Sequence, residues 1–92
     1  MTSQTVVVGN RLGLHARAAA RFVHLASQFQ SQVLVTSGSQ TMDGKSIMGI
    51  LLLAAATGSE LTVSADGVDE QAAVEELCRL VANGFGEDRC SV

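Results

Sequence analysis

The sequence contains no tryptophan, no tyrosine and no proline, and it has only three phenylalanines among 92 residues. Basic residues are also few, because six lysines and arginines stand against nine acidic residues. Proteins that bind nucleic acid usually concentrate basic side chains on one surface, often with aromatic rings on which bases stack. The sequence shows neither feature, so we expect no nucleic-acid partner.

Cysteines and long apolar segments are scarce as well. Cys78 and Cys90 lie far from any CxxC or Cys/His spacing, so we expect reduced thiols, no disulfide framework and no bound metal. The longest apolar run, residues 47–56, is about half the roughly 20 residues of a membrane helix. No secretory signal opens the sequence. We therefore expect no membrane insertion and a cytoplasmic location.

The residues that are present indicate one globular domain. Hydrophobic residues make up 47% of the chain, charged residues 16%, and the net charge is −3. A chain of this size can bury one hydrophobic core. We expect a single domain over residues 1–92, with a flexible tail at about 87–92.

The charges are unevenly distributed along the chain. Before residue 50, Asp43 is the only acidic residue, whereas four basic residues occur there: Arg11, Arg17, Arg21 and Lys45. This basic N-terminal half of the chain is consistent with a small positive patch that binds one phosphate or one acidic partner.

Periodicity predicts the order βαββαβα. Apolar residues alternate or cluster as in strands at 4–8, 32–36, 39–42 and 60–65, and they recur with helical spacing at 16–28, 47–56 and 70–83. Ala19, Phe22, Val23, Ala26 and Phe29 form the predicted buried stripe of the first helix. In the last helix, the predicted core residues are Ala73, Val74, Leu77, Leu80 and Val81. This order favours an α+β sandwich, in which helices cover one face of a single sheet.

The stretch "GLHARAAARF" carries the strongest chemical signal. Gly13 permits a tight turn, and His15 stands at or beside the cap of the first helix. The next amides, those of Ala16 and Arg17, lack intrahelical acceptors and attract an anion. Arg17 adds a guanidinium group, with Arg21 one turn later. The positive surroundings should lower the pKa of His15, leaving a neutral and nucleophilic imidazole suited to accept a phosphoryl group.

An ordinary alternative is that His15 is a solvated or capping residue. His24 offers no shared metal site, because nine helical residues place it on nearly the opposite side from His15. The sequence has no P-loop, no paired carboxylates and no residue set for magnesium. We therefore expect no independent turnover and no cofactor, and a small metal-binding domain or independent enzyme is disfavoured.

Two motifs carry a family resemblance. "LGLHARAAARF" and "DGKSIMGILLLAA" resemble the HPr family of histidine-containing phosphocarriers of the bacterial phosphotransferase system, over about residues 4 to 86. The resemblance implies an open-faced β-sandwich, with a four-stranded antiparallel sheet covered on one face by three helices. It also implies that His15 accepts a phosphoryl group on Nδ1 from enzyme I, with phosphoenolpyruvate as ultimate donor, and passes it to an enzyme IIA domain for sugar transport. Arg17 would bind the phosphate.

One residue departs from the family pattern. Ala18 stands where the family usually has proline, and both this change and the ending "NGFGED" resemble the nitrogen-related branch. A regulatory interaction module, whose phosphorylation state is read by a target, therefore remains an alternative to sugar transport. We expect a monomer in either case.

Ser46 begins the second motif's apolar helix. A serine there is an ordinary N-cap, but the resemblance also implies regulatory phosphorylation by HPr kinase/phosphorylase. Ile50, Leu51 and Leu53 are expected in the core. Exposed apolar residues of this helix, beside the first helix, predict a partner-docking surface. We call this the docking surface, and it consists of Ala16, Ala20, Arg21, Ile47, Met48 and Leu52.

Overall fold

A computed structural model describes residues 1–8, 16–53 and 60–86. It contains the strands β1 (Thr2–Val7), β2 (Gln32–Ser37), β3 (Gln40–Asp43) and β4 (Glu60–Asp66). The helices are α1 (Ala16–Ala26), α2 (Ile47–Leu53) and α3 (Glu70–Ala82), followed by a short 3-10 turn, η1 (Gly84–Gly86). The predicted order and fold class are confirmed. The expected end of the second helix at residues 54–56 and the expected tail at 87–92 lie outside the described residues.

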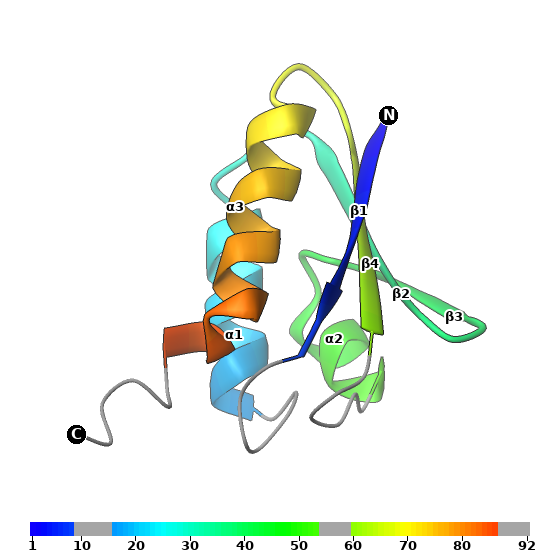
Figure 1. Cartoon of the computed structure of the whole chain (residues 1–92), viewed down its shortest axis with the longest axis vertical. Coiled ribbons are helices and arrows are strands. Elements are labelled where there is room, and N and C mark those ends of the chain that lie inside the picture. Colours follow the sequence, from blue (N-terminus) through cyan, green and yellow to red (C-terminus); the bar gives the residue numbers. More distant parts are fainter. Residues whose placement is uncertain (9–15, 54–59, 87–92) are drawn as a thin grey trace.

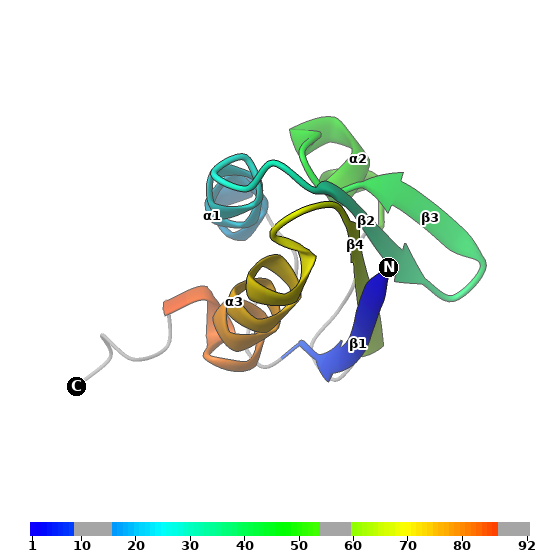
Figure 2. The same cartoon turned by 90° about the horizontal axis from the view of Figure 1, so that it is seen from above.

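The four strands form one antiparallel sheet in the order β1-β4-β2-β3 (Figure 1). All three helices lie on the same side of this sheet (Figure 2). The uncovered side is polar along a row of paired threonines. Thr5 Oγ1 lies 3.0 Å from Thr62 Oγ1, and Thr36 Oγ1 lies 3.0 Å from Thr41 Oγ1. Hydroxyl pairs across neighbouring strands stabilise a sheet face that meets water.

The core lies between the sheet and the helices. Leu61, Val63 and Ala65 alternate along β4, the strand predicted at residues 60–65, and all three are buried. From the predicted helix stripes, α1 buries Ala19, Phe22 and Ala26, and α3 buries Ala73, Val74, Leu77 and Val81.

The predicted core was incomplete at its edges. Val23, Phe29 and Leu80 are only partly buried, whereas Ala18 and Cys78 are buried although neither was assigned to the core. Helix α3 contacts β1 and β4, and α1 contacts both α2 and α3, so each helix is covered over a wider stripe than a three-and-four spacing describes. Cys78 is a free thiol, and burial raises its pKa.

Two carboxylates tie the start of α3 to distant segments. The Asp69 carboxylate accepts hydrogen bonds from the backbone amides of Gln30 and Ser31, at 2.8 and 2.9 Å, and from the Ser31 hydroxyl. These bonds lower the pKa of Asp69. Glu70 accepts hydrogen bonds from the Thr2 hydroxyl at 2.6 Å and from the Gly67 amide at 3.2 Å. The loop after α1 and the start of β1 are thereby fastened to α3.

We expect the Glu70 contacts to make folding stability sensitive to acid. The Thr2 hydrogen bond, the Gly67 amide and the nearby terminal amino group lower the pKa of Glu70 from 4.5 to about 2. A lowered folded-state pKa contributes stability above the unfolded-state value, and that contribution is lost as the pH falls from about 4.5 towards 2. In urea titrations at pH 6 and pH 3, Glu70→Gln should lose less stability on acidification than the wild type. Glu76→Gln, an exposed α3 control, should behave as the wild type; an unchanged pH dependence in Glu70→Gln would contradict this assignment.

Candidate functional site

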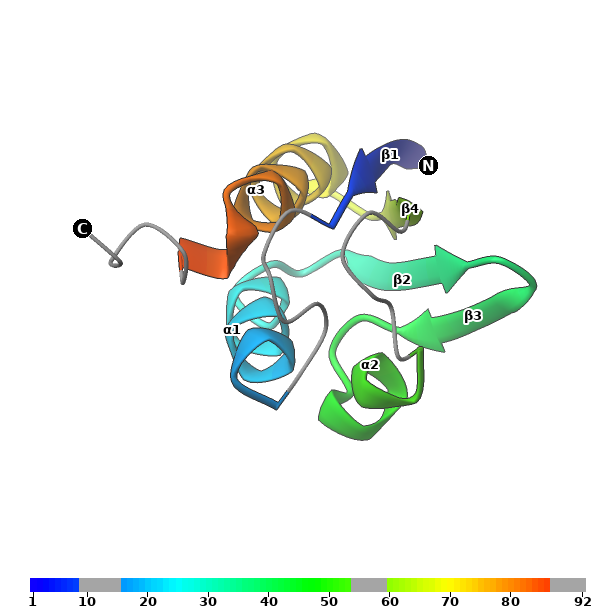
Figure 3. The ribbon, with the colours of Figure 1, turned by 60° about the horizontal axis from the view of Figure 1, so that its bottom comes forward.

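The first turn of α1 begins at Ala16, the residue that follows His15 in the sequence. The amides of Ala16 and Arg17 are therefore among the first four of the helix, which lack intrahelical acceptors. The beginnings of α1 and α2 lie at the same end of the molecule (Figure 3). His15 itself and Gly13 lie outside the described residues. Ala18, at the usual proline position, is the third residue of the helix and is completely buried.

The exposed side of α1 is basic. Arg17, Arg21, His24 and Gln28 are all exposed. Arg21 also makes a contact that the sequence did not reveal, because its Nη1 donates a hydrogen bond of 2.5 Å to the carbonyl oxygen of Phe85. The two residues are 64 positions apart, and no sequence spacing indicates that they meet.

Phe85 is a core residue that the sequence analysis missed. Its side chain is fully buried, although its backbone is in the left-handed region with φ of 57°. This conformation is costly for a bulky residue and persists where the surrounding packing fixes it. The only signal in the sequence was an isolated aromatic residue between two glycines, after the expected end of the last helix.

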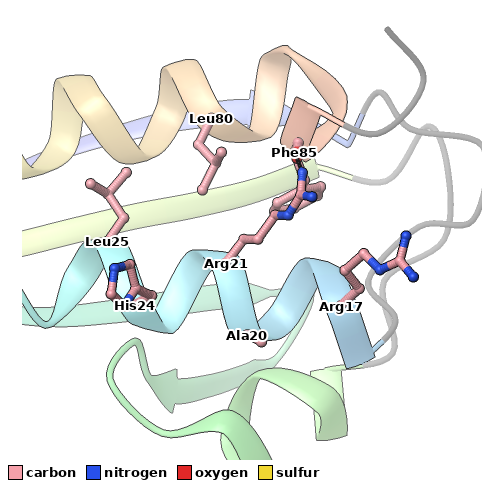
Figure 4. Close-up of a pocket in the computed structure, with 7 residues that line it drawn as sticks. All are labelled: Arg17, Ala20, Arg21, His24, Leu25, Leu80 and Phe85. Carbon is pink, nitrogen blue, oxygen red and sulfur yellow. Dashed lines mark hydrogen bonds between the residues drawn. The ribbon is translucent and has the colours of Figure 1, made fainter. Parts of the chain in front are cut away.

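A groove runs between α1 and the end of α3, with a volume of about 530 Å³. Figure 4 shows Leu25 and Leu80 pointing toward one another across it, and Arg21 reaching over to Phe85. We call it the α1–α3 groove. Its lining residues are Arg17, Ala20, Arg21, His24, Leu25, Leu80 and Phe85.

The predicted docking surface is exposed. Ile47, Met48 and Leu52 of α2 are 44%, 68% and 61% exposed, whereas Ile50 and Leu53 are buried as expected. Leu51 is only partly buried. Ala16, Ala20 and Arg21 of α1 are exposed too, and the two helices contact each other. An apolar centre of this kind with a basic neighbour is typical of protein-binding surfaces.

Ser46 caps α2, which confirms the ordinary structural role predicted for it. Its hydroxyl accepts a hydrogen bond of 3.1 Å from the Gly49 amide, in the first turn of the helix. The neighbouring Lys45 donates from Nζ to the Phe29 carbonyl oxygen at 2.7 Å, so the segment before α2 is fastened to the end of the α1 region.

Removing the cap should destabilise the protein measurably. We expect Ser46→Ala to lower the free energy of unfolding by about 0.5 to 2 kcal/mol, and Ser46→Asp to lower it much less, because aspartate also accepts the Gly49 hydrogen bond. Urea unfolding measures both, with Ser39→Ala in the exposed hairpin turn as the control. A loss for Ser46→Ala no larger than that of Ser39→Ala would show that the cap contributes little.

Within residues 1–8, 16–53 and 60–86, no three or more His, Cys, Asp or Glu side chains are grouped so that they would hold a metal ion. No helix in this described part is long and apolar enough to cross a membrane.

Comparison with known proteins identifies the family. Residues 2–83 match the family model described as "PTS HPr component phosphorylation site". The chain belongs to the HPr family. A relative named "Phosphocarrier protein HPr" from Cupriavidus necator is 47% identical over 87 residues, which covers 95% of this chain and 98% of the relative. An HPr of the same name from Pseudomonas aeruginosa is 41% identical, with 95% of this chain and 98% of the relative covered.

Solved structures agree with this membership. An HPr structure from Thermoanaerobacter tengcongensis superposes with a TM-score of 0.90 at 42% identity, over 95% of this chain and 98% of the other. Crh from Bacillus subtilis, whose crystal structure is described as a swapped dimer, gives a TM-score of 0.74 at 43% identity, over 91% and 97% of the two chains. The function that follows from HPr membership is that of a phosphocarrier of the phosphotransferase system, with components of that system as partners. The names of these relatives give no specific support to the nitrogen-related branch.

Proposed function

We propose that the chain accepts a phosphoryl group on Nδ1 of His15 from phosphorylated enzyme I and passes it to an enzyme IIA domain in the cytoplasm. The observation that carries this proposal is the start of α1 at Ala16, directly after His15. The amides of Ala16 and Arg17 then belong to the helix end that attracts anions.

The local charges favour the phosphorylated state. A helix N-terminus is equivalent to roughly half a positive charge and stabilises a nearby exposed anion by about 0.3 to 1 kcal/mol. Arg17, which is exposed in the first turn, adds a guanidinium group whose N–H fork matches phosphate oxygens. Arg17 is therefore assigned the role of phosphate clamp.

Both transfers, the one from enzyme I and the one to the enzyme IIA domain, are nucleophilic displacements at phosphorus. The neutral imidazole attacks phosphorus, so that a nitrogen–phosphorus bond forms while the bond from phosphorus to the donor breaks. The reverse exchange on the enzyme IIA domain restores the free imidazole. The chain supplies the acceptor atom and the anion-binding turn, and the partners supply the remaining groups.

The docking surface places apolar contacts beside this turn. Ile47, Met48 and Leu52 are exposed on α2, and the flexible thioether of Met48 helps one surface fit several partners in succession. Phosphorylation of Ser46 by HPr kinase/phosphorylase would add about −1.5 to −2 charges next to this surface, and so would repel an acidic partner. We assign the chain a monomeric single domain that exchanges these partners one at a time.

The test of the carrier function is a two-step transfer. Purified protein incubated with enzyme I and phosphoenolpyruvate should gain about 80 Da, the mass of one phosphoryl group, in an acid-labile and base-stable form. Adding an enzyme IIA domain should return the protein to its original mass as the domain becomes labelled. A gain that survives acid, or a label that no enzyme IIA domain removes, would contradict the proposal.

A further inference from the structure

We propose that the α1–α3 groove binds a small organic anion with an apolar body, of the aryl or alkyl carboxylate class. The groove's volume of about 530 Å³ falls within the roughly 300 to 1,000 Å³ of small-molecule sites. Its floor is apolar, since Leu25 and Leu80 are only partly buried and point toward each other, while the buried Phe85 lies farther along the groove beside Arg21 (Figure 4). An apolar ligand body would remove this remaining leucine surface from water.

The polar lining of the groove selects the charge of the ligand. Arg17, Arg21 and His24 line it within two turns of one helix, and among the described residues that line it none is acidic. A cation would be repelled by the Arg21 guanidinium, which reaches across the groove to Phe85 (Figure 4), and a neutral molecule would use none of its charge. An anionic head group on an apolar body complements both parts of the groove.

Arg21 is positioned to bind such a head group. Its Nη1 donates to the Phe85 carbonyl, which fixes the guanidinium at the groove without consuming it, because a guanidinium carries five N–H donors. The same contact bridges the α1 wall and the η1 turn (Figure 4). A bridged groove favours a short ligand over an extended peptide, so a small carboxylate is the occupant we assign.

Binding is tested with 4-phenylbutyrate as the probe and 4-phenylbutanol as its uncharged analogue. Amide shifts in an NMR titration should saturate with a dissociation constant on the order of 1 mM, the range for a ligand of about twelve heavy atoms. The shifts should cluster at Leu25, Leu80 and Phe85, and the alcohol should bind roughly three- to tenfold more weakly.

Matched variants distinguish the contribution of the apolar groove residues to binding from that of the charged ones. Leu25→Gln should weaken the binding of both probes, whereas Arg21→Gln should reduce the affinity for 4-phenylbutyrate to that for 4-phenylbutanol. Val68→Gln, at a residue 85% exposed outside the groove, should bind as the wild type does. Equal affinity of the two probes for the wild type, shifts centred on α2, or no saturation by about 20 mM would overturn the proposal. A stronger response of the same residues to an acidic helical peptide would replace the small carboxylate with a protein segment.

One consequence rests on the proposed function. Ala20 and Arg21 belong both to the groove and to the docking surface, so a bound anion should slow phosphoryl transfer from enzyme I. At a saturating concentration, 4-phenylbutyrate should reduce the wild-type rate at least twofold, and the ratio of rates with and without probe should approach one in Leu25→Gln. A wild type that accepts phosphate equally fast with the probe bound would refute this coupling, whereas a wild type that accepts none without the probe would refute the carrier proposal instead.

Discussion

A His15→Ala variant should accept no phosphoryl group from phosphorylated enzyme I, with a rate at least about 10⁴-fold below that of the wild type. Loss of a nucleophile removes the covalent route altogether, and comparable losses in other enzymes reach six orders of magnitude. Mass spectrometry of the intact protein after incubation with enzyme I and phosphoenolpyruvate measures the stoichiometry directly.

The second histidine provides the matched control. The chain has only two histidines, and His24 is exposed on α1, nine positions after His15 in the sequence. A His24→Ala variant should reach one phosphoryl group per chain at the end of the reaction, whatever its rate. If His15→Ala still reached one phosphoryl group per chain and His24→Ala did not, the acceptor would be His24, and the anion-binding first turn of α1 would have no role in the transfer.

Phe85→Ala should lower the free energy of unfolding by about 3 to 5 kcal/mol, the usual range when a buried phenylalanine is truncated. The side chain is fully buried, and alanine at φ of 57° keeps the backbone cost while losing the packing. This loss is a large fraction of the 5 to 15 kcal/mol that stabilises a typical domain. Urea or guanidinium unfolding followed by circular dichroism measures it.

Phe85→Leu separates the volume of the side chain from its hydrophobicity. Leucine keeps most of the apolar contact, so we expect a clearly smaller loss than for alanine. A loss below about 1 kcal/mol for Phe85→Ala would show that the η1 turn does not contribute to the cooperative core. The Arg21 hydrogen bond to Phe85 would then be a surface contact rather than one held by the fold.

Local patterns in the sequence predicted those parts of the fold that neighbouring residues determine. The pattern of apolar residues at 60–65 predicted β4, and its alternating residues Leu61, Val63 and Ala65 are the buried ones. Ser46 before an apolar run identified the beginning of α2 and its cap. The second helix is short and apolar on every side, and a small core covers only one side of it. The sequence therefore predicted that Met48 and Leu52 are exposed.

The contacts that the sequence did not reveal join residues far apart along the chain. Asp69 is the N-cap residue of α3, but its carboxylate makes no capping hydrogen bond and instead accepts from the amides of Gln30 and Ser31, 39 and 38 positions away. The Arg21–Phe85 bond spans 64 positions. Periodicity reports which face of an element is buried, but it carries no information on which distant polar group completes a turn. The α1–α3 groove depends on such contacts, so it appeared only with the structure.

The phosphocarrier proposal makes His15, at the start of α1, the acceptor of the phosphoryl group. Protein labelled with ¹⁵N in its histidines and phosphorylated by enzyme I should show, by NMR, phosphorus coupling to Nδ1 of His15 and unchanged nitrogen signals for His24. Phosphorus coupled to a His24 nitrogen, or an acid-stable ester on Ser46 with no phosphohistidine signal, would contradict the account.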